Sequence, residues 1–207
     1  MLSSISIIVD AETTSTRPNA RVTDFAALIF DHRTKQVVDH IQVFFDVNSQ
    51  TGHLDPETMK WREENNLVIM EPSCFSNHQT LSKFLNFVHD FTEKETEFGI
   101  YANGSNFDFP ILQSLIHDVN LNAAEGKEEL KTKWNFHKEI CLRSIAMALF
   151  TKEQYKQAQE VAREKTQHVL NTIEHSSPRV AQKHNSLHDC IFEVWMVDAC
   201  YEKLKSI

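Results

Sequence analysis

The sequence lacks any apolar stretch long enough to cross a membrane. A transmembrane helix needs roughly 18 or more consecutive apolar residues, and no run within the 207 residues approaches that length. The first residues, MLSSISIIVDAET, lack the basic segment that opens a secretory signal and soon reach the acidic Asp10. We therefore expect a cytoplasmic protein whose first segment is a strand.

Cysteine is scarce, and no two cysteines are close in sequence. The four cysteines, at positions 74, 141, 190 and 200, include no CxxC pair, which argues against a zinc ribbon. Without a secretory signal, we expect reduced thiols. Free cysteine usually behaves as a small buried hydrophobe, and we expect that here.

Positive charge is also in short supply. The chain carries 21 Lys and Arg against 29 Asp and Glu, a net charge of −8. This balance argues against a basic surface that grips nucleic acid by charge alone. It does not exclude a nuclease, because clustered carboxylates that hold divalent cations make an enzyme acidic, and the cations then provide positive charge where a phosphate docks.

What is present suits one globular α/β domain over residues 1–207. Hydrophobic residues make up 41% and charged residues 24% of the chain, which is ordinary for a soluble domain of this size. The β-branched segments 3–10, 21–31 and 36–47 predict an antiparallel meander. We expect helices over 55–65, 80–91, 108–119, most of 139–174 and 188–205, a strand over 97–104, a loop with partial helix over 120–138, and a break at Pro178 within 175–183. This order favours a mixed central sheet flanked by helices, with three antiparallel strands first and parallel additions later.

The first candidate site is the pair of carboxylates in IIVDAET. Asp10 and Glu12 lie two residues apart at the end of an apolar strand, so both point to the same face of the sheet. Paired like charges repel unless a cation lies between them, and hard oxygen ligands suit Mg²⁺ or Mn²⁺. Alone, the pair also fits an ordinary solvated strand end.

The second candidate lies in YANGSNFDFPIL, residues 101–112. Asp108 opens an amphipathic helix after the Asn103-Gly104 turn. Taken alone it is equally an acid favoured by the helix dipole. Phe107 and Phe109 flank it, and each fits either the core or a stacking contact with a base.

The third candidate is the stretch KHNSLHDC. Asp189 is near the start of the last predicted helix and His184 lies on the loop before it, so both can approach one site. We expect His188 to be a helix-start or surface residue, because the two histidines do not form a zinc-binding i, i+4 pair within one helix.

The three stretches together resemble a known family. The order DxE, then NGxxFD, then HxxxxD is that of the DEDDh 3′→5′ exonucleases, which have a ribonuclease H-like fold. FDFPIL and HxSxHDC are similar to the branch that contains exonuclease A of T-even bacteriophages and its bacterial relatives, which suggests a phage origin and thus the host cytoplasm. EICLRSI (139–145) resembles an arginine–threonine motif of that branch but has Ser144 in place of threonine, so no role is carried over to Arg143.

The resemblance implies a two-metal hydrolysis of phosphodiester bonds from 3′ ends of single-stranded DNA, with release of nucleoside 5′-monophosphates. Asp10, Glu12, Asp108 and Asp189 would hold two Mg²⁺ or Mn²⁺ ions, and His184 would be the general base, since its ordinary pKa is near neutral. Thr13 and Phe107 would contact the terminal nucleotide.

Three alternatives remain at this point. The first is an exoribonuclease on the same fold, because no motif reports on the 2′-hydroxyl. The second is a catalytically silent nucleic-acid-binding module, and the third is a zinc hydrolase that uses some of the 11 histidines. Trp61 fits the core better than a stacking role. The sequence gives no oligomeric state and no membrane partner.

Overall fold

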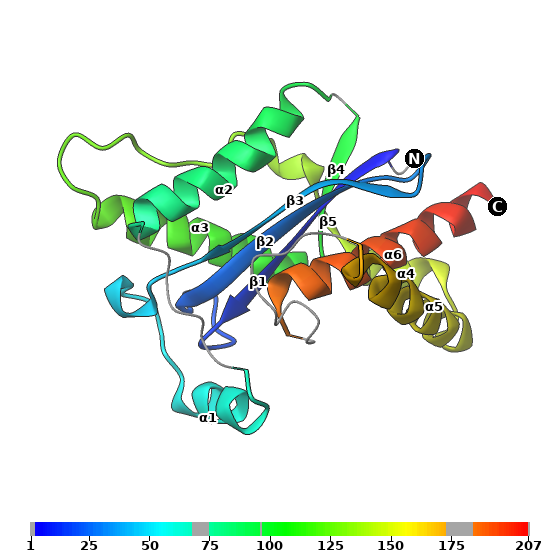
Figure 1. Ribbon diagram of the computed structural model, residues 1–207, viewed down its shortest axis with the longest axis horizontal. Coiled ribbons are helices and arrows are strands. Elements are labelled where there is room, and N and C mark those ends of the chain that lie inside the picture. The colour runs from blue at the N-terminus through cyan, green and yellow to red at the C-terminus, as the bar shows by residue number, and fades with distance from the viewer. Residues whose placement is uncertain (1–2, 68–74, 96, 173–183, 207) are drawn as a thin grey trace.

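Five strands form one mixed sheet in the order β3-β2-β1-β4-β5 (Figure 1). The strands are β1 (Ile5–Thr13), β2 (Val22–Asp31), β3 (Gln36–Phe44), β4 (Phe98–Ala102) and β5 (Glu139–Cys141). The β3-β2-β1 pairings are antiparallel, whereas β1–β4 and β4–β5 are parallel. The C-terminal ends of β1, β4 and β5 therefore meet at one end of the sheet, where open α/β sheets bind their ligands.

Six α-helices accompany the sheet in the part of the chain that the structure, a computed structural model, describes: residues 3–67, 75–95, 97–172 and 184–206. They are α1 (Pro56–Glu64), α2 (Asn77–Thr92), α3 (Ser105–Leu121), α4 (Leu142–Leu149), α5 (Lys152–Leu170) and α6 (Ser186–Lys205), with short 3₁₀ turns at Val47–Ser49 and Phe136–Lys138. None of the described helices is both long and apolar enough to span a bilayer.

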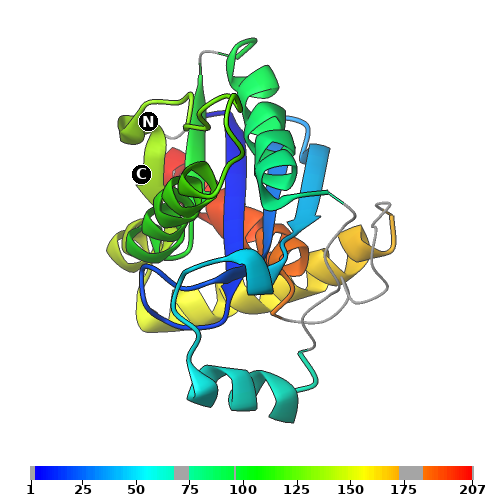
Figure 2. The same ribbon diagram turned by 90° about the vertical axis from the view of Figure 1, so that its left-hand side faces the viewer.

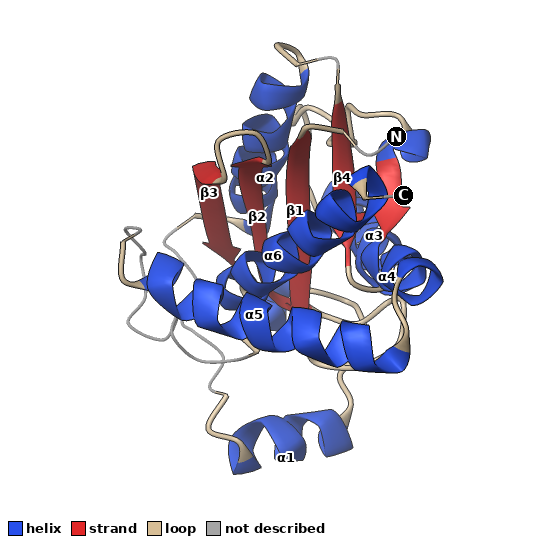
Figure 3. Cartoon of the chain, turned by 90° about the vertical axis from the view of Figure 1, so that its right-hand side faces the viewer, coloured by secondary structure: helices blue, strands red, loops and turns tan. Residues whose placement is uncertain are grey.

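The helices divide between the two faces of the sheet. Helices α2 and α3 cover one face (Figure 2), and α4, α5 and α6 lie over the other (Figure 3). Alternate β1 residues serve the two cores: Ile7 and Val9 pack toward α2 and α3, whereas Ile8 packs toward α6. Burying each such side chain stabilises the fold by about 1.5–3 kcal/mol. Asp10 and Glu12 continue the Ile8 register, so they face the α6 side.

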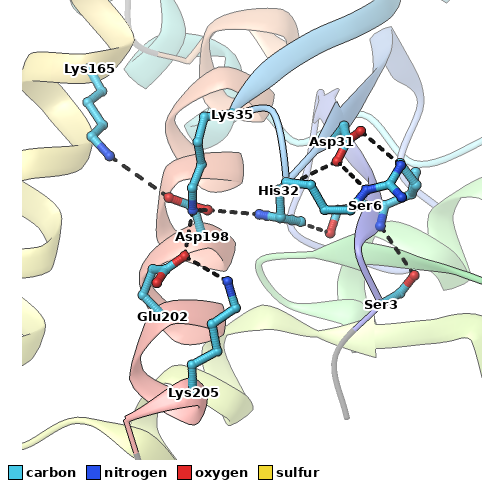
Figure 4. Close-up of polar contacts among 11 residues, drawn as sticks. Ser3, Ser6, Asp31, His32, Lys35, Lys165, Asp198, Glu202 and Lys205 are labelled. Carbon is cyan, nitrogen blue, oxygen red and sulfur yellow. Dashed lines mark hydrogen bonds and ion pairs between the residues drawn. The ribbon is translucent and has the colours of Figure 1, made fainter.

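A polar cluster joins helix α6 to the sheet near the start of β1 and the end of β2 (Figure 4). The Ser6 hydroxyl lies 2.8 Å from His32 Nε2, and His32 Nδ1 lies 3.0 Å from Asp198 Oδ1. Lys35 Nζ also donates to Asp198. Serine, histidine and aspartate follow one another as in a hydrolase triad. All three are buried, so a substrate cannot reach them and the cluster has a structural role.

Helix α1 lies apart from the sheet, beyond the C-terminal end of β1 (Figures 1 and 3). Its start is as predicted: Asp55 caps the helix by accepting from the Thr58 N–H, and Pro56 is at the first helical position. The expectation that Trp61 belongs to the core is wrong, because its side chain is 44% exposed. An isolated helix has no second layer to bury it.

Other boundaries differ from the sequence-based expectation. Residues 139–141 form the short strand β5 and not the start of a helix, because their backbone pairs with β4. Helix α3 begins at Ser105, so Asp108 is in its first turn but does not open it. The expected break over 175–183 lies outside the described residues.

The cysteines agree in part with the expectation. Cys190 and Cys200 are free and buried, Cys141 is free but only partly buried, and Cys74 lies outside the described residues. The expectation of burial is therefore wrong for Cys141, which occupies the N-cap position of α4. Burial alone would raise the pKa of its thiol, but hydrogen bonds with Ser144 and Ser105 outweigh this and lower the pKa to about 7.

Candidate active site

The C-terminal half of β1 carries the first two carboxylates. Asp10 and Glu12 project from the same strand face, in register with Ala26 and Asp24 of β2. Glu12 is held by an ion pair, because Arg62 Nη1 of α1 donates to its Oε2 over 3.0 Å. Arg62 is buried, and the side chain of Glu12 is 13% exposed.

Helix α3 brings Asp108 to the same end of the sheet. Asp108 is 5% exposed, and its Oδ1 accepts a hydrogen bond of 3.3 Å from the Ala11 N–H of β1. The turn after β4 makes this possible, because Gly104 caps α3 immediately beyond the strand end. Asp108 thereby links the first turn of α3 to the strand that carries Asp10 and Glu12.

The first turns of α6 supply the next group. The Ser186 hydroxyl donates to the buried Asp24 Oδ2 over 2.6 Å, which fixes the start of the helix against β2. Asn185 caps the helix, and Asp189 lies in its first turn. His188 Nδ1 lies 2.9 Å from Asp189 Oδ1. His188 is at the helix start as expected, and it also contacts a carboxylate of the site.

His184 lies immediately before this helix in a left-handed backbone conformation, with φ of 63°. This conformation is costly for a residue other than glycine and often marks a functional position. The His184 ring meets the Trp61 ring edge-on, with centroids 5.2 Å apart. Helix α1 therefore contacts the site twice, through Trp61 at His184 and through Arg62 at Glu12.

A fifth carboxylate belongs to the site, and sequence reasoning missed it. Glu193 follows Asp189 by four residues, one helical turn on the same face of α6. It is 3% exposed, and its Oε2 has no hydrogen-bond partner among the described residues. The signal was available, because a charged residue one turn after Asp189 interrupts an otherwise apolar helix face.

Ligand atoms of Glu12, His184 and Asp189 lie within 4.8 Å of one another. Two cavities open beside this trio, one of about 820 Å³ and one of about 640 Å³. Asp10, Phe107, His184 and Asp189 line both cavities. Asp108 and Glu193 line the larger cavity, and Glu12 and Thr13 line the smaller one. The predicted site residues therefore converge at one place, between the two cavities.

The electrostatics of the carboxylates favour a bound cation. Burial, followed by the charges of Glu193 and Asp108, raises the pKa of Asp10 well above its ordinary value. Burial and the charge of Asp24 raise the pKa of Glu12 to about 8, although Arg62 opposes the rise. Crowded carboxylates at a strand end lose this repulsion when a divalent cation lies among them.

The pKa values of Asp108 and Glu193 shift in the same direction. Burial raises the pKa of Asp108 to about 7, against the hydrogen bond from the Ala11 N–H. Burial and the charges of Asp108 and Asp189 raise the pKa of Glu193 well above its ordinary value, against a hydrogen bond with Asn103. This set of oxygen donors, with an unpartnered buried Oε2, fits Mg²⁺ or Mn²⁺.

The two candidate phenylalanines, Phe107 and Phe109, differ in their position. Phe109 is 4% exposed and packs in the core with α2 and α3, whereas Phe107 is half-buried and lines both cavities. Thr13 is buried, and its hydroxyl donates to the Ser15 carbonyl. The sequence did not indicate Arg62, and it assigned Trp61 to the core, because α1 reaches the site only through the folded chain.

The comparisons with known proteins agree with this arrangement. The model of the 3′-5′ exoribonuclease Rv2179c-like domain family matches residues 5–201, so the chain belongs to this family of 3′→5′ exonuclease domains. The predicted resemblance to 3′→5′ exonucleases is thereby confirmed.

Individual relatives are more distant. An exodeoxyribonuclease of Enterobacteria phage T4 is 27% identical over 139 residues, which cover 60% of this chain and 61% of that protein. A full-length 3′-exonuclease has a similar structure, with a TM-score of 0.58, 12% identity and coverage of 98% of this chain and 83% of that chain. Exonuclease I of E. coli with single-stranded DNA gives a TM-score of 0.56, 14% identity, and coverage of 99% and 43%. These structural likenesses confirm the predicted ribonuclease H-like α/β fold.

Proposed function

We propose that residues 1–207 act as one exonuclease domain that hydrolyses phosphodiester bonds at the 3′ end of a single-stranded nucleic acid and releases nucleoside 5′-monophosphates. The observation that carries the proposal is the convergence of five carboxylates and His184 between two cavities at the C-terminal end of β1. A binding module has no need of such closely placed, mutually repelling carboxylates.

Asp10, Glu12, Asp108 and Asp189 are the residues proposed to hold two divalent cations, Mg²⁺ or Mn²⁺. When bound, such cations supply Lewis-acid stabilisation of the attacking and leaving oxygens. His184 accepts the proton of the attacking water, because imidazole has an ordinary pKa close to neutral. The contact with Trp61 orients its ring at the edge of the carboxylate group.

Thr13 and Phe107 are proposed to receive the terminal nucleotide. Thr13 lines the smaller cavity together with Ser15, Thr58 and the exposed Trp61, so hydroxyl groups and one aromatic face surround this space. A nucleoside offers both hydroxyl groups for hydrogen bonds and a flat base for stacking. The smaller cavity is therefore the pocket for the 3′-terminal nucleoside.

Two substrates have separate support. The phage T4 relative is named an exodeoxyribonuclease, which favours DNA, and the family description names an exoribonuclease, which favours RNA.

The test offers DNA and RNA oligomers of one sequence to the purified protein with Mg²⁺, Mn²⁺, Zn²⁺ or EDTA. We expect degradation with Mg²⁺ or Mn²⁺, and the faster sugar identifies the substrate. Activity with tightly held zinc alone would instead favour a zinc hydrolase that uses Glu12, His184 and Asp189. No cleavage with any metal would contradict the proposal.

A further inference from the structure

The two cavities beside the carboxylates differ in the charge of their outer walls. The smaller one is bordered by the acidic Asp55 and Glu57, and the guanidinium of Arg62 is already paired with Glu12. The larger one is bordered by two arginines, Arg143 of α4 and Arg163 of α5. A polyanionic strand that reaches the carboxylates is repelled on the first side and attracted on the second.

Helix α5 presents a continuous polar row to the larger cavity. Gln159, Arg163 and Gln167 all line it and follow one another at four-residue spacing, so they lie on one face of the helix. The neighbouring face, which includes Ala162 and Val169, is buried against α6. Packing against α6 thus fixes the direction in which the row points.

The side chains of this row are available to a ligand. Arg163 and Gln167 are exposed, and Arg163 makes no ion pair with any residue in the described part of the chain. An exposed arginine without an acidic partner, beside two amide side chains, matches the phosphodiester backbone: the guanidinium binds phosphate oxygens in pairs, and the amides donate single hydrogen bonds.

We propose that the α5 row of Gln159, Arg163 and Gln167, continued by Arg143, binds the backbone phosphates of the strand upstream of the scissile bond. The inference rests on the proposed function and adds a direction to it. The 3′-terminal nucleoside occupies the smaller cavity, the scissile phosphate lies over the carboxylates, and the rest of the strand leaves through the larger cavity along α5. Because the row contacts only backbone, it serves DNA and RNA alike and reads no sequence.

Two variants test the row by adding negative charge without opening a hole in the core, Arg163→Glu and Gln167→Glu. Each has a matched control. Gln157→Glu makes the same change on the side of α5 that lines a different cavity with Phe150 and Trp195. Arg33→Glu makes the same charge reversal on a 69% exposed side chain just after β2, which unlike Arg163 pairs with an acid, Asp31. Circular dichroism and thermal melting check that all four variants fold.

The readout is fluorescence anisotropy of 5′-labelled DNA and RNA strands of roughly 12 nucleotides, with Ca²⁺ in place of Mg²⁺. We expect Arg163→Glu to weaken binding about tenfold, to reduce the slope of log Kd against log salt concentration by about one, and to affect a dinucleotide much less. Gln167→Glu should weaken binding in the same length-dependent way. The two controls should bind as the parent protein does.

The outcomes separate this inference from the proposed function. If the parent protein degrades strands with Mg²⁺ but Arg163→Glu and Gln167→Glu bind long strands normally, the strand path is wrong and the exonuclease stands. If the parent protein binds strands and the two variants bind them weakly, but the parent protein cleaves nothing, the strand path is supported and the proposed exonuclease activity is wrong. Equal weakening by the matched controls, or no strand binding by the parent protein, overturns the path.

Discussion

The charge of Asp108 is expected to be necessary for cleavage and to lower the stability of the fold. Its carboxyl is buried, its pKa is raised to about 7, and it accepts the Ala11 N–H. Asp108→Asn keeps an oxygen for that hydrogen bond and removes the charge. We expect cleavage to fall to background while the free energy of unfolding in EDTA near pH 8 rises by about 1 kcal/mol. Urea unfolding and a nuclease assay measure both, with the exposed Asp90→Asn of α2 as the control. Near-normal activity of Asp108→Asn would remove this residue from the site.

Arg62 controls the protonation of Glu12. Arg62 lowers the pKa of Glu12 through both its charge and its hydrogen bond, against burial and the charge of Asp24, which raise it. In Arg62→Gln this opposition is lost, the pKa of Glu12 rises further, and a smaller fraction is ionised at a given pH. We therefore expect the acidic limb of the rate profile to move to higher pH, and Arg62→Lys to restore part of the shift. An unchanged limb in Arg62→Gln would show that Glu12 is not the group that titrates.

Helix α6 contributes to the site with its first turns and to the stability of the fold with its later turns. The first turns carry Asp189 and Glu193, whereas Asp198, further along the helix, contacts the buried His32 and the more exposed Lys35. Asp198→Ala leaves the buried His32 Nδ1 without its partner, whereas Lys35 keeps Glu202, so we expect the free energy of unfolding to fall by about 3 kcal/mol. The fully folded variant should retain cleavage. Urea unfolding and a nuclease assay in the absence of urea check this, and a loss below about 1 kcal/mol would mean that the cluster contributes only as a surface ion pair does.

The sequence predicted elements better where periodicity is strong than where tertiary contacts decide. The strand that carries Asp10 and Glu12, the Asp55-Pro56 start of α1 and the last helix follow from local patterns. Strand β5 could not, because three residues carry no period and are defined only by pairing with β4. Likewise, no local signal tells that Arg62 reaches Glu12, fifty positions earlier in the chain. Glu193 was detectable from its helical spacing to Asp189 but was not singled out.

For the whole molecule, the crowded carboxylates predict a stability that depends on pH and on metal. Glu12 has a pKa of about 8 and Asp108 about 7 when folded, against ordinary values of 4.5 and 3.8. Between about pH 4 and pH 8 the folded chain retains protons that the unfolded chain releases, so the free energy of unfolding falls as pH rises. A divalent cation that binds only the folded state offsets this fall.

Thermal melting across that pH range, in EDTA and in excess Mg²⁺, measures this dependence. We expect the melting temperature in EDTA to decline toward pH 8 and Mg²⁺ to reduce the decline. The double variant Glu12→Gln, Asp108→Asn should show a flatter profile in EDTA, because two of the responsible groups are gone. The same slope in the parent protein and the double variant would place the pH dependence elsewhere in the molecule.

The direction of degradation is the most direct measure of the central claim. A 5′-labelled single strand with a free 3′-hydroxyl, the same strand with a blocked 3′ end, and a circular strand are incubated with the protein and Mg²⁺, and the products are resolved by length. The account predicts a ladder that shortens one nucleotide at a time from the free 3′ end, with the blocked and circular strands left intact. Immediate release of the 5′ label as a mononucleotide, or cleavage of the circle, would contradict a site built to act at the 3′ end.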